Sequence, residues 1–196
     1  MPISLRFATL HDAPAVAAIY GPHVAHEATS FEQVPPDGAE MASRITHLLE
    51  TYPWLVAEDA GQVIGYSYAS PHRSRAGYRW CVEVSVYVDP SRHRGRVGRA
   101  LYTALFEVLA LQGFVNAYAG ITLPNPASVG FHEAMGFRLV GTYRRIGYKL
   151  GRWHDVAWYD RALTPHPDHP PEPRPLPELR REGHLPEYLR RPDGGF

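Results

Sequence analysis

Residues 86–101 read Val86-Tyr87-Val88-Asp89-Pro90-Ser91-Arg92-His93-Arg94-Gly95-Arg96-Val97-Gly98-Arg99-Ala100-Leu101. The alternating apolar start indicates a strand, and the end of the segment begins an amphipathic helix. A turn of this kind directs unpaired backbone N–H groups and the positive end of a helix dipole at one point, where Arg94, Arg96 and Arg99 add positive charge. The segment therefore predicts either a pyrophosphate site or a turn that needs glycine for steric reasons alone.

A second segment, residues 125–137, reads Asn125-Pro126-Ala127-Ser128-Val129-Gly130-Phe131-His132-Glu133-Ala134-Met135-Gly136-Phe137. Asn125 is suited to the N-cap position, Pro126 to the first helical position and Gly136 to the C-terminal stop. The segment predicts a short capped helix, about one helix and one strand downstream of the glycine and arginine turn.

The two segments together resemble the GNAT acyltransferase superfamily, whose members bind acetyl-CoA. The resemblance implies that the turn from Arg94 to Arg99 holds the CoA pyrophosphate and that the strand from Val84 to Val88 pairs with the pantetheine arm. The cofactor-binding residues expected on this basis are Val86, Tyr87, Val88, Arg94, Gly95, Arg96, Val97, Gly98, Arg99, Asn125 and Ser128.

Three residues depart from the family pattern. His93 replaces the usual first Gln or Arg of the turn, Arg96 replaces the first Gly of the Gly-x-Gly pair, and His132 replaces the usual Tyr of the second helix. If the backbone at Arg96 needs a positive φ, arginine costs on the order of 1 kcal/mol relative to glycine. The adjacent Gly95 is able to absorb the bend, and we expect acetyl-CoA binding to survive.

Length and composition agree with one compact enzyme domain. The chain has 196 residues, 44% of them hydrophobic, and a formal net charge of zero, so no general attraction to nucleic acid or to an anionic membrane is expected. Its apolar runs are too short to span a bilayer, and the N-terminus lacks a signal-peptide pattern. The single cysteine, Cys81, excludes an internal disulfide, and a cytoplasmic location follows as the default.

The composition changes near Leu163. Residues 164–196 contain 9 of the 19 prolines with few large apolar residues, as is typical of an extended or disordered tail. A short docked helix between Glu178 and Leu189 has no strong periodicity to support it. We therefore expect an acetyltransferase domain over residues 1–163 and a Pro/Arg-rich tail over residues 164–196.

Upstream of the tail, strands and helices alternate in a regular order. Strands are expected at residues 3–7, 54–58, 63–69, 79–88, 115–122, 138–148 and 153–163. Helices are expected after Asp12, ending at Gly21-Pro22, after Asp37, before Gly113 and from Asn125. The fold class is α/β (α+β), with a mixed, mostly antiparallel sheet flanked by helices, as in the GNAT fold.

Alternation along residues 79–88 separates two faces. Val82, Val84 and Val86 point one way, while Glu83 and Tyr87 point the other. A carboxylate on a central strand is costly to bury unless it is paired or used. Glu83 is thus either a carboxylate bonded to arginine near a strand end or a general base.

Amine acetylation requires such a base. Only the neutral amine attacks a thioester, yet α-amines, with pKa values of about 7.7 to 8 in peptides, are largely protonated at neutral pH. Glu83 is placed to take the proton, directly or through a water. The resemblance assigns the oxyanion donors to strand N–H groups near Val86. His132 is the candidate acid for the departing thiolate, and a packed or surface histidine is the alternative.

Further segments are similar to the phosphinothricin acetyltransferases over roughly residues 3–163. They include Tyr52-Pro53-Trp54-Leu55-Val56-Ala57-Glu58 and Gly147-Tyr148-Lys149-Leu150-Gly151-Arg152-Trp153-His154-Asp155-Val156. Such enzymes acetylate the α-amine of phosphinothricin, and relatives act on methionine sulfoximine and methionine sulfone. The resemblance implies a similar small substrate and a homodimer.

An amino-acid analogue with a second anionic or sulfonyl-like group needs hydrogen-bond donors at both ends. Arg75 offers a bidentate fork and Tyr78 a hydroxyl, and the resemblance places both in the substrate pocket. A solvated, arginine-rich loop is the alternative. Thr29 and Phe31 match a loop that borders the substrate site and the dimer partner in the family, although Phe31 is equally suited to the core.

Other functions stay open at this point. A protein or peptide N-acetyltransferase would need an open acidic groove, which Arg73, Arg75 and Arg79 oppose. A non-catalytic acyl-CoA-binding module is conceivable because of His93 and Arg96, but the presence of Glu83 and His132 argues for an enzyme. The spacing of the histidines suggests no metal site. The physiological amine is not determined by the sequence.

Overall fold

The computed structural model describes residues 3–92 and 96–189 and contains a seven-stranded sheet in the order β1-β2-β3-β4-β5-β7-β6. The strands are β1 (Ser4–Phe7), β2 (Trp54–Asp59), β3 (Gln62–Pro71), β4 (Cys81–Val88), β5 (Asn116–Leu123), β6 (Arg138–Lys149) and β7 (Arg152–Ala162). Only β4 and β5 pair in parallel. The expected mixed, mostly antiparallel sheet is confirmed.

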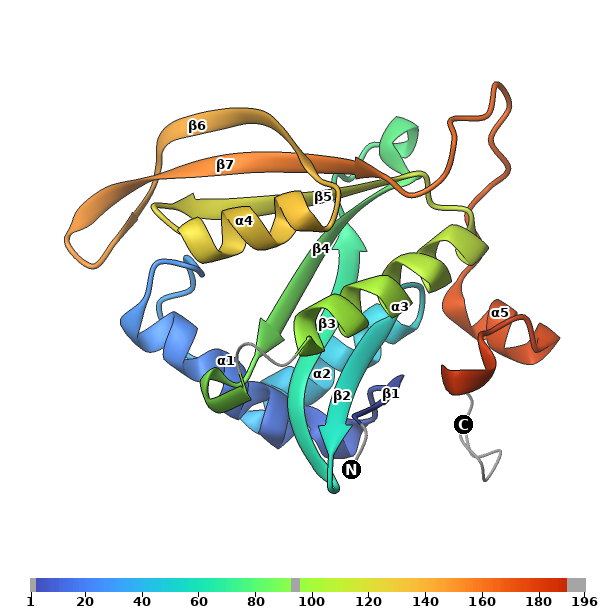
Figure 1. Cartoon of the computed structure of the whole chain (residues 1–196), viewed down its shortest axis with the longest axis horizontal. Coiled ribbons are helices and arrows are strands. Elements are labelled where there is room, and N and C mark those ends of the chain that lie inside the picture. Colours follow the sequence, from blue (N-terminus) through green and yellow to red (C-terminus); the bar gives the residue numbers. More distant parts are fainter. Residues whose placement is uncertain (1–2, 93–95, 190–196) are drawn as a thin grey trace.

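Helices cover both faces of this sheet (Figure 1). They are α1 (Ala13–His26), α2 (Gly38–Leu49), α3 (Val97–Gln112), α4 (Pro126–Ala134) and α5 (Leu176–Glu182), with short 3₁₀ turns η1 (Leu10–Asp12), η2 (Ala76–Tyr78), η3 (Pro90–Arg92) and η4 (Glu187–Leu189). Among the described residues, none of these helices has the length and apolar character needed to cross a membrane.

Two hydrophobic clusters lie on opposite faces of the sheet. Val82 and Val84 belong to the cluster built around α3, with Val86 packed against it. Tyr87 packs against the second cluster, which α1 and α2 cover. The predicted alternation along β4 is therefore confirmed, and its two faces meet different helices.

Local capping signals set several of the helix ends. The Asp37 side chain accepts a hydrogen bond from the Glu40 amide at 2.8 Å at the start of α2, as the sequence indicated. Gly113, with a φ of 93°, ends α3 in the left-handed conformation. The prediction that Gly21-Pro22 ends the first helix is wrong, because α1 continues to His26 with Pro22 inside it. Val24, beyond the proline, is buried in the second cluster and favours the longer helix.

The described part of the C-terminal segment differs from the extended or disordered tail expected from composition. Leu176 and Leu179 of α5 are both 0% exposed and join the cluster around α3. The backbone amide of Leu176 donates to the Thr51 carbonyl at 3.1 Å, and Gln112 Nε2 donates to the Arg174 carbonyl at 2.8 Å. The segment thus closes the core beside α3 (Figure 1).

Candidate active site

A cavity lies where β4 and β5 separate. These strands pair only from Cys81 to Glu83, opposite Asn116 to Tyr118, and then diverge. The resulting cavity has a volume of about 640 Å³ and is lined by β4 from Val84 to Val88, by β5, by the start of α3 and by α4. Past Glu83, the edge of β4 that faces β5 is not paired with that strand, so its backbone groups border the cavity.

The N-terminus of α3 forms one end of the cavity. Arg96 is the N-cap residue and has a φ of 59° and a ψ of 1°, in the left-handed region. Its side chain makes no capping hydrogen bond, and the first helical bond runs from the Ala100 amide to the Arg96 carbonyl. The amides of residues 97–99 thus precede the helical ladder and leave a positive helix end next to the cavity.

Most of the residues expected to bind the cofactor line this one cavity. They are Val86, Tyr87, Val88, Arg96, Val97, Gly98, Arg99, Asn125 and Ser128. Arg94 and Gly95, like His93, lie outside the described residues. Asn125 also caps α4, because its side chain accepts from the Ser128 amide at 3.0 Å. The structure therefore brings the two segments together, while their roles in binding stay predictions.

Glu83 is the last residue of β4 paired with β5, directly before Val84, the first cavity-lining residue of the strand. Its side chain is 38% exposed, and burial of the carboxyl group raises its pKa above the ordinary value, an effect that Arg73 opposes. A carboxyl group with a raised pKa is a stronger base than an ordinary one. Its role as the base stays a prediction.

His132 lies in the cavity wall and is only 6% exposed. Its Nδ1 is 2.8 Å from the Ser128 carbonyl oxygen and therefore donates a proton to it, while Nε2 is 3.2 Å from the Tyr102 hydroxyl. Burial lowers the pKa of His132, with the Ser128 hydrogen bond acting in the opposite direction. The resting ring is therefore neutral, and its Nε2 accepts a hydrogen bond from Tyr102.

The expected substrate residues do not all share the cavity. Thr29 lines it, and its hydroxyl donates to Glu27 at 3.0 Å. Phe31 instead packs across β6 and contacts the His154 ring, with centroids 6.1 Å apart. Arg75 and Tyr78 are exposed in the connection that contains η2, and neither lines the cavity. Their role in substrate binding stays a prediction.

The lining residues that the sequence analysis missed include His23, Arg92 and Tyr102. Arg92 belongs to the quoted turn, so its charge was a usable signal; its side chain also donates to Asp59 at 3.0 Å. Tyr102 follows Leu101 on α3 and is fully buried. His23 comes from α1, and its ring lies 5.2 Å from that of Tyr87, a proximity that no local pattern indicated.

Within residues 3–92 and 96–189, no group of three or more His, Cys, Asp or Glu side chains is arranged to hold a metal ion.

Comparisons with known proteins give a consistent result. A family model described as an acetyltransferase (GNAT) domain matches residues 5–158. A phosphinothricin N-acetyltransferase of Streptomyces viridochromogenes is 40% identical over 89% of this chain and 93% of its own length. An L-methionine sulfoximine/L-methionine sulfone acetyltransferase of Pseudomonas aeruginosa is 37% identical over 84% of this chain and 97% of its own length.

A solved structure supports the same assignment. It is a GNAT superfamily phosphinothricin acetyltransferase of Sinorhizobium meliloti in complex with AcCoA, with a TM-score of 0.83 and 37% identity, covering 88% of this chain and 95% of that one. The strand separation, the positive end of α3 and these matches agree, and the chain belongs to the GNAT acetyltransferase family.

Proposed function

We propose that this protein transfers the acetyl group of acetyl-CoA to the α-amine of a small amino-acid analogue of the phosphinothricin, methionine sulfoximine or methionine sulfone type. The similarity to two acetyltransferases named for such substrates supports this choice. The observation that carries the proposal is the cavity between β4 and β5, which ends at the N-terminal amides of α3 and begins beside a carboxylate.

The cofactor fits the chemistry of this cavity. The amides of Val97, Gly98 and Arg99 and the guanidinium groups of Arg96 and Arg99 are suited to a pyrophosphate, and Arg94 and Gly95 belong to the same turn. The edge of β4 that faces away from β3 offers backbone N–H and C=O groups near Val86 to the amides of the pantetheine arm, with Tyr87 and Val88 also lining the cavity. Asn125 and Ser128 border the same path from α4.

The chain supplies three chemical roles. Glu83 takes the proton of the attacking amine, directly or through a water, so that nitrogen has a free lone pair. Backbone N–H groups near Val86 donate to the carbonyl oxygen as it gains negative charge. Bound acetyl-CoA supplies an activated acyl group and a thiolate leaving group. His132 provides a proton for that thiolate only after Nε2 has itself gained one of the two protons that the ammonium nitrogen loses on becoming an amide, because Nδ1–H is committed to Ser128.

The proposed substrate site lies next to Glu83. Arg75 is proposed to bind the carboxylate or phosphinate, Tyr78 to add a hydroxyl, and Thr29 with Phe31 to border the site from the loop after α1. Arg75 and Tyr78 are exposed, so they contact substrate without a rearrangement of the core.

Acetyl-CoA binding and turnover test the proposal separately. At 100 times its dissociation constant, acetyl-CoA is expected to raise the unfolding free energy by about 2.7 kcal/mol, and Arg99→Ala to reduce this stabilisation while Arg152→Ala, an exposed control, does not. Thiol release should follow addition of phosphinothricin, methionine sulfoximine or methionine sulfone. Binding without turnover on these compounds, but with turnover on a peptide amine, would favour the peptide acetyltransferase instead. Binding with no turnover on any amine would favour the binding module.

A homodimer is also proposed, formed by the β6–β7 hairpin. Exposed apolar side chains gather there: Leu139, Val140, Tyr143, Ile146, Tyr148, Leu150 and Trp153. An apolar patch of this kind on a soluble enzyme marks an interaction surface. Sedimentation should give a dimer for the natural chain and for Leu10→Glu, a control at another exposed apolar residue, but a monomer for Ile146→Glu. A monomeric natural chain would refute the dimer.

The remaining proposals concern location and partners. A cytoplasmic location is supported by the free thiol of Cys81, which suits a reducing compartment. The partner is a small molecule rather than nucleic acid or a membrane, in keeping with the zero net charge. Fractionation of cells that express the chain, with detection in the cytosolic fraction, tests the location.

A further inference from the structure

His72 is fixed in an unusual place for an ionisable side chain. It follows the last residue of β3, and its ring stacks on Tyr118 of β5, with centroids 4.3 Å apart and planes 11° apart. The ring of Trp158 from β7 lies against the imidazole in a T-shaped arrangement, with ring centroids 5.4 Å apart and planes 71° apart. Only 12% of the side chain is exposed. Aromatic rings from two other strands thus define the orientation of the imidazole.

The imidazole faces Glu83. Its Nδ1 lies 3.8 Å from Glu83 Oε2, and within the described residues this buried nitrogen has no hydrogen-bond partner. A buried ring nitrogen without a partner is costly, so its retention calls for an explanation. The gap exceeds a hydrogen bond by less than 1 Å, which a small rotation of the half-buried Glu83 side chain closes.

The surroundings bring the proton affinities of the two groups closer together. Burial, helped by the positive charge of Arg73, lowers the pKa of His72, and burial raises that of Glu83 while Arg73 opposes the rise. Two ionisable groups this close together can titrate as a coupled pair rather than independently. The other ionisable groups around them are Tyr68 from β3, Tyr118 from β5 and, acting on Tyr118, Cys81 and Asp160.

We propose that His72 is a positioning residue that acts through Glu83, accepting the proton that Glu83 removes from the amine and passing it to solvent. This inference rests on the proposed function, because it requires Glu83 to be the base. The overall reaction of an ammonium substrate with a thioester yields an amide, a thiol and one released proton. That proton moves from nitrogen to the Glu83 carboxylate and then to His72 Nδ1, which restores the carboxylate; the imidazolium then loses it to water.

The neutral ring must hold its own proton on Nε2 for this step. Nδ1 then presents a lone pair to Glu83, consistent with a buried nitrogen that has no other partner. The role differs from that of His132, whose Nδ1 already donates to a backbone carbonyl. The two histidines thus have opposite tautomers in this assignment.

The test compares pH profiles of turnover on methionine sulfoximine with acetyl-CoA. His72→Phe keeps the ring packing but loses both nitrogens, and it should lower kcat at pH 6 to 8 by about tenfold, less than the hundredfold or more expected for loss of the base itself. KM values should stay within about twofold and the deficit should shrink at high pH. His72→Asn, which keeps a polar nitrogen but does not titrate, should show the same loss. His47→Asn, at an exposed histidine, is the control.

A double-mutant cycle decides whether His72 acts through Glu83. In a Glu83→Gln background, His72→Phe should cost less than about twofold, because there is no longer a proton to receive. An equal cost in both backgrounds, an unchanged pH profile, or full rescue by His72→Asn would each overturn the proposal. If Glu83→Gln itself keeps natural turnover, the base assignment fails and this inference with it; if only His72→Phe is silent, the base assignment stands alone. The acetyl-CoA thermal shift shows whether each variant is folded. If His72→Phe does not fold, His72→Asn takes its place in the test.

Discussion

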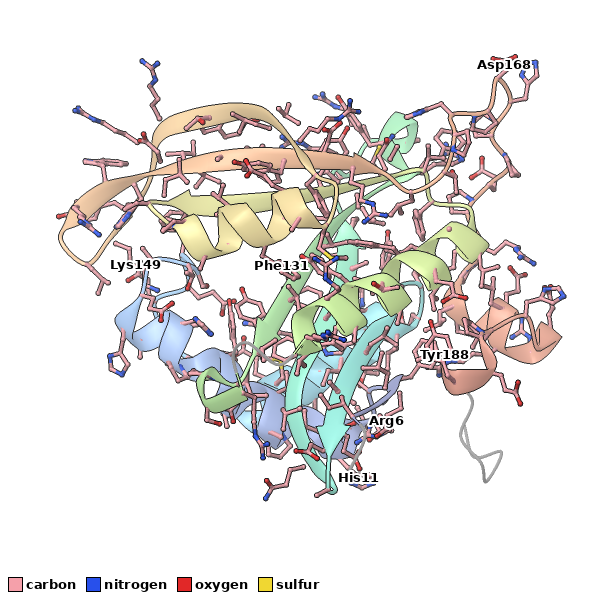
Figure 2. The ribbon with its side chains drawn as sticks, in the orientation of Figure 1. Arg6, His11, Phe131, Lys149, Asp168 and Tyr188 are labelled. Carbon is pink, nitrogen blue, oxygen red and sulfur yellow. The ribbon has the colours of Figure 1, made fainter. Side chains whose placement is uncertain are left out.

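The hydroxyl of Tyr102 donates to Nε2 of His132 across 3.2 Å, and this bond joins α3 to α4 inside the cavity wall. Tyr102 is 0% exposed, and the rings of Phe131 and Phe137 surround the pair, so water has little access to either partner. Figure 2 shows Phe131 on α4 facing α3. The acid proposed for the reaction is thus held by a residue from α3, the helix whose N-terminus borders the proposed pyrophosphate site.

Tyr102→Phe should destabilise the fold because it leaves Nε2 buried without a donor. The expected loss of unfolding free energy is about 1 to 3 kcal/mol, measured by chemical denaturation. His132→Phe leaves the tyrosine hydroxyl unpaired and should cost a similar amount. The double variant should cost less than the sum of the two, since an apolar pair leaves neither group unsatisfied. Strictly additive losses would show that the bond contributes nothing.

Glu83→Gln should lower turnover by roughly 10²- to 10⁴-fold near neutral pH, with acetyl-CoA affinity little changed. Higher pH should rescue it in part, because more free amine is then present. In the natural enzyme, the raised pKa of Glu83 means that kcat/KM falls as pH drops through that value and the carboxylate is protonated. Glu50→Gln, at an exposed carboxylate, serves as the control. Near-natural turnover of Glu83→Gln at neutral pH would mean that the base lies elsewhere.

The raised pKa of Glu83 also predicts that its ionised carboxylate destabilises the fold, although the same carboxylate supports activity. A raised pKa means that the folded state binds the proton more tightly than the unfolded chain, so stability falls as pH rises through the folded value. Glu83→Gln should therefore raise the melting temperature at neutral pH while it lowers activity. Such an exchange of stability for activity is common at functional sites. An unchanged or lowered melting temperature at neutral pH would contradict it.

Much of the fold could be predicted because its signals are local. The Asp37 cap with Glu40 and the Asn125 cap with Ser128 depend on residues three positions apart, and both occur as expected. The docked tail could not be predicted in this way. Leu176 and Leu179 make no long periodic pattern. They are buried by packing into the cluster around α3, and Thr51 and Gln112, far away in the sequence, hydrogen-bond the backbone of the segment.

Part of the proposed site could also be predicted, because some of its residues belong to continuous segments with local signals. Residues in continuous segments, such as Val86 and Arg99, fall along one strand and one helix start, so a motif finds them together. His23 and Tyr102 enter the cavity from elements whose placement depends on packing of the whole sheet. The pairing of His72 with Glu83 likewise requires the β3–β4 register, in which Ser70 lies opposite Glu83.

The docked tail leads to a prediction that reverses the one from composition. Leu179→Ala should lower the unfolding free energy by about 2 to 5 kcal/mol, because a fully buried leucine leaves a cavity. Leu111→Ala, at an exposed leucine of α3, should cost far less. Deletion of residues 164–196 should lower the melting temperature at least as much as Leu179→Ala. A truncated chain with the natural melting temperature would show that the segment packs on the domain without stabilising the fold.

Arg96 is the turn residue for which the sequence raised a question of strain, and its φ of 59° answers it. Arg96→Gly should stabilise the protein without ligand by about 1 kcal/mol, since glycine adopts this conformation at little cost. The same change removes a cation from the cavity wall and should weaken acetyl-CoA binding by about tenfold, or about 1.4 kcal/mol. Arg96→Lys, which keeps the charge, should bind nearly as the natural chain does. Titration calorimetry and thermal melts measure both effects, and unchanged affinity in Arg96→Gly would remove this residue from the proposed site.

Gly147 and Phe31 allow the substrate loop to be tested apart from the cofactor site. A Cβ at Gly147 would lie 2.3 Å from the Phe31 ring, so Gly147→Ala must displace that ring. The loop carrying Phe31 is tied to the same hairpin by Lys149, whose Nζ donates to the Ser30 carbonyl at 2.7 Å. Figure 2 shows Lys149 beside the loop that follows α1. Because Lys149 holds the loop in place, displacement of the Phe31 ring should change the border of the proposed substrate site.

Gly147→Ala is therefore expected to raise KM for methionine sulfoximine severalfold while the acetyl-CoA thermal shift stays unchanged. A stability loss of about 1 to 3 kcal/mol should accompany it, because the added methyl overpacks the contact. Gly141→Ala is the matched control on the same strand, since a Cβ there meets no atom within 4 Å. Phe31→Leu in the Gly147→Ala background, which shortens the obstructing ring, should recover part of the stability. If Gly147→Ala loses stability but keeps its KM for the amine, Phe31 belongs to the core alone and the proposed border of the substrate site does not include it.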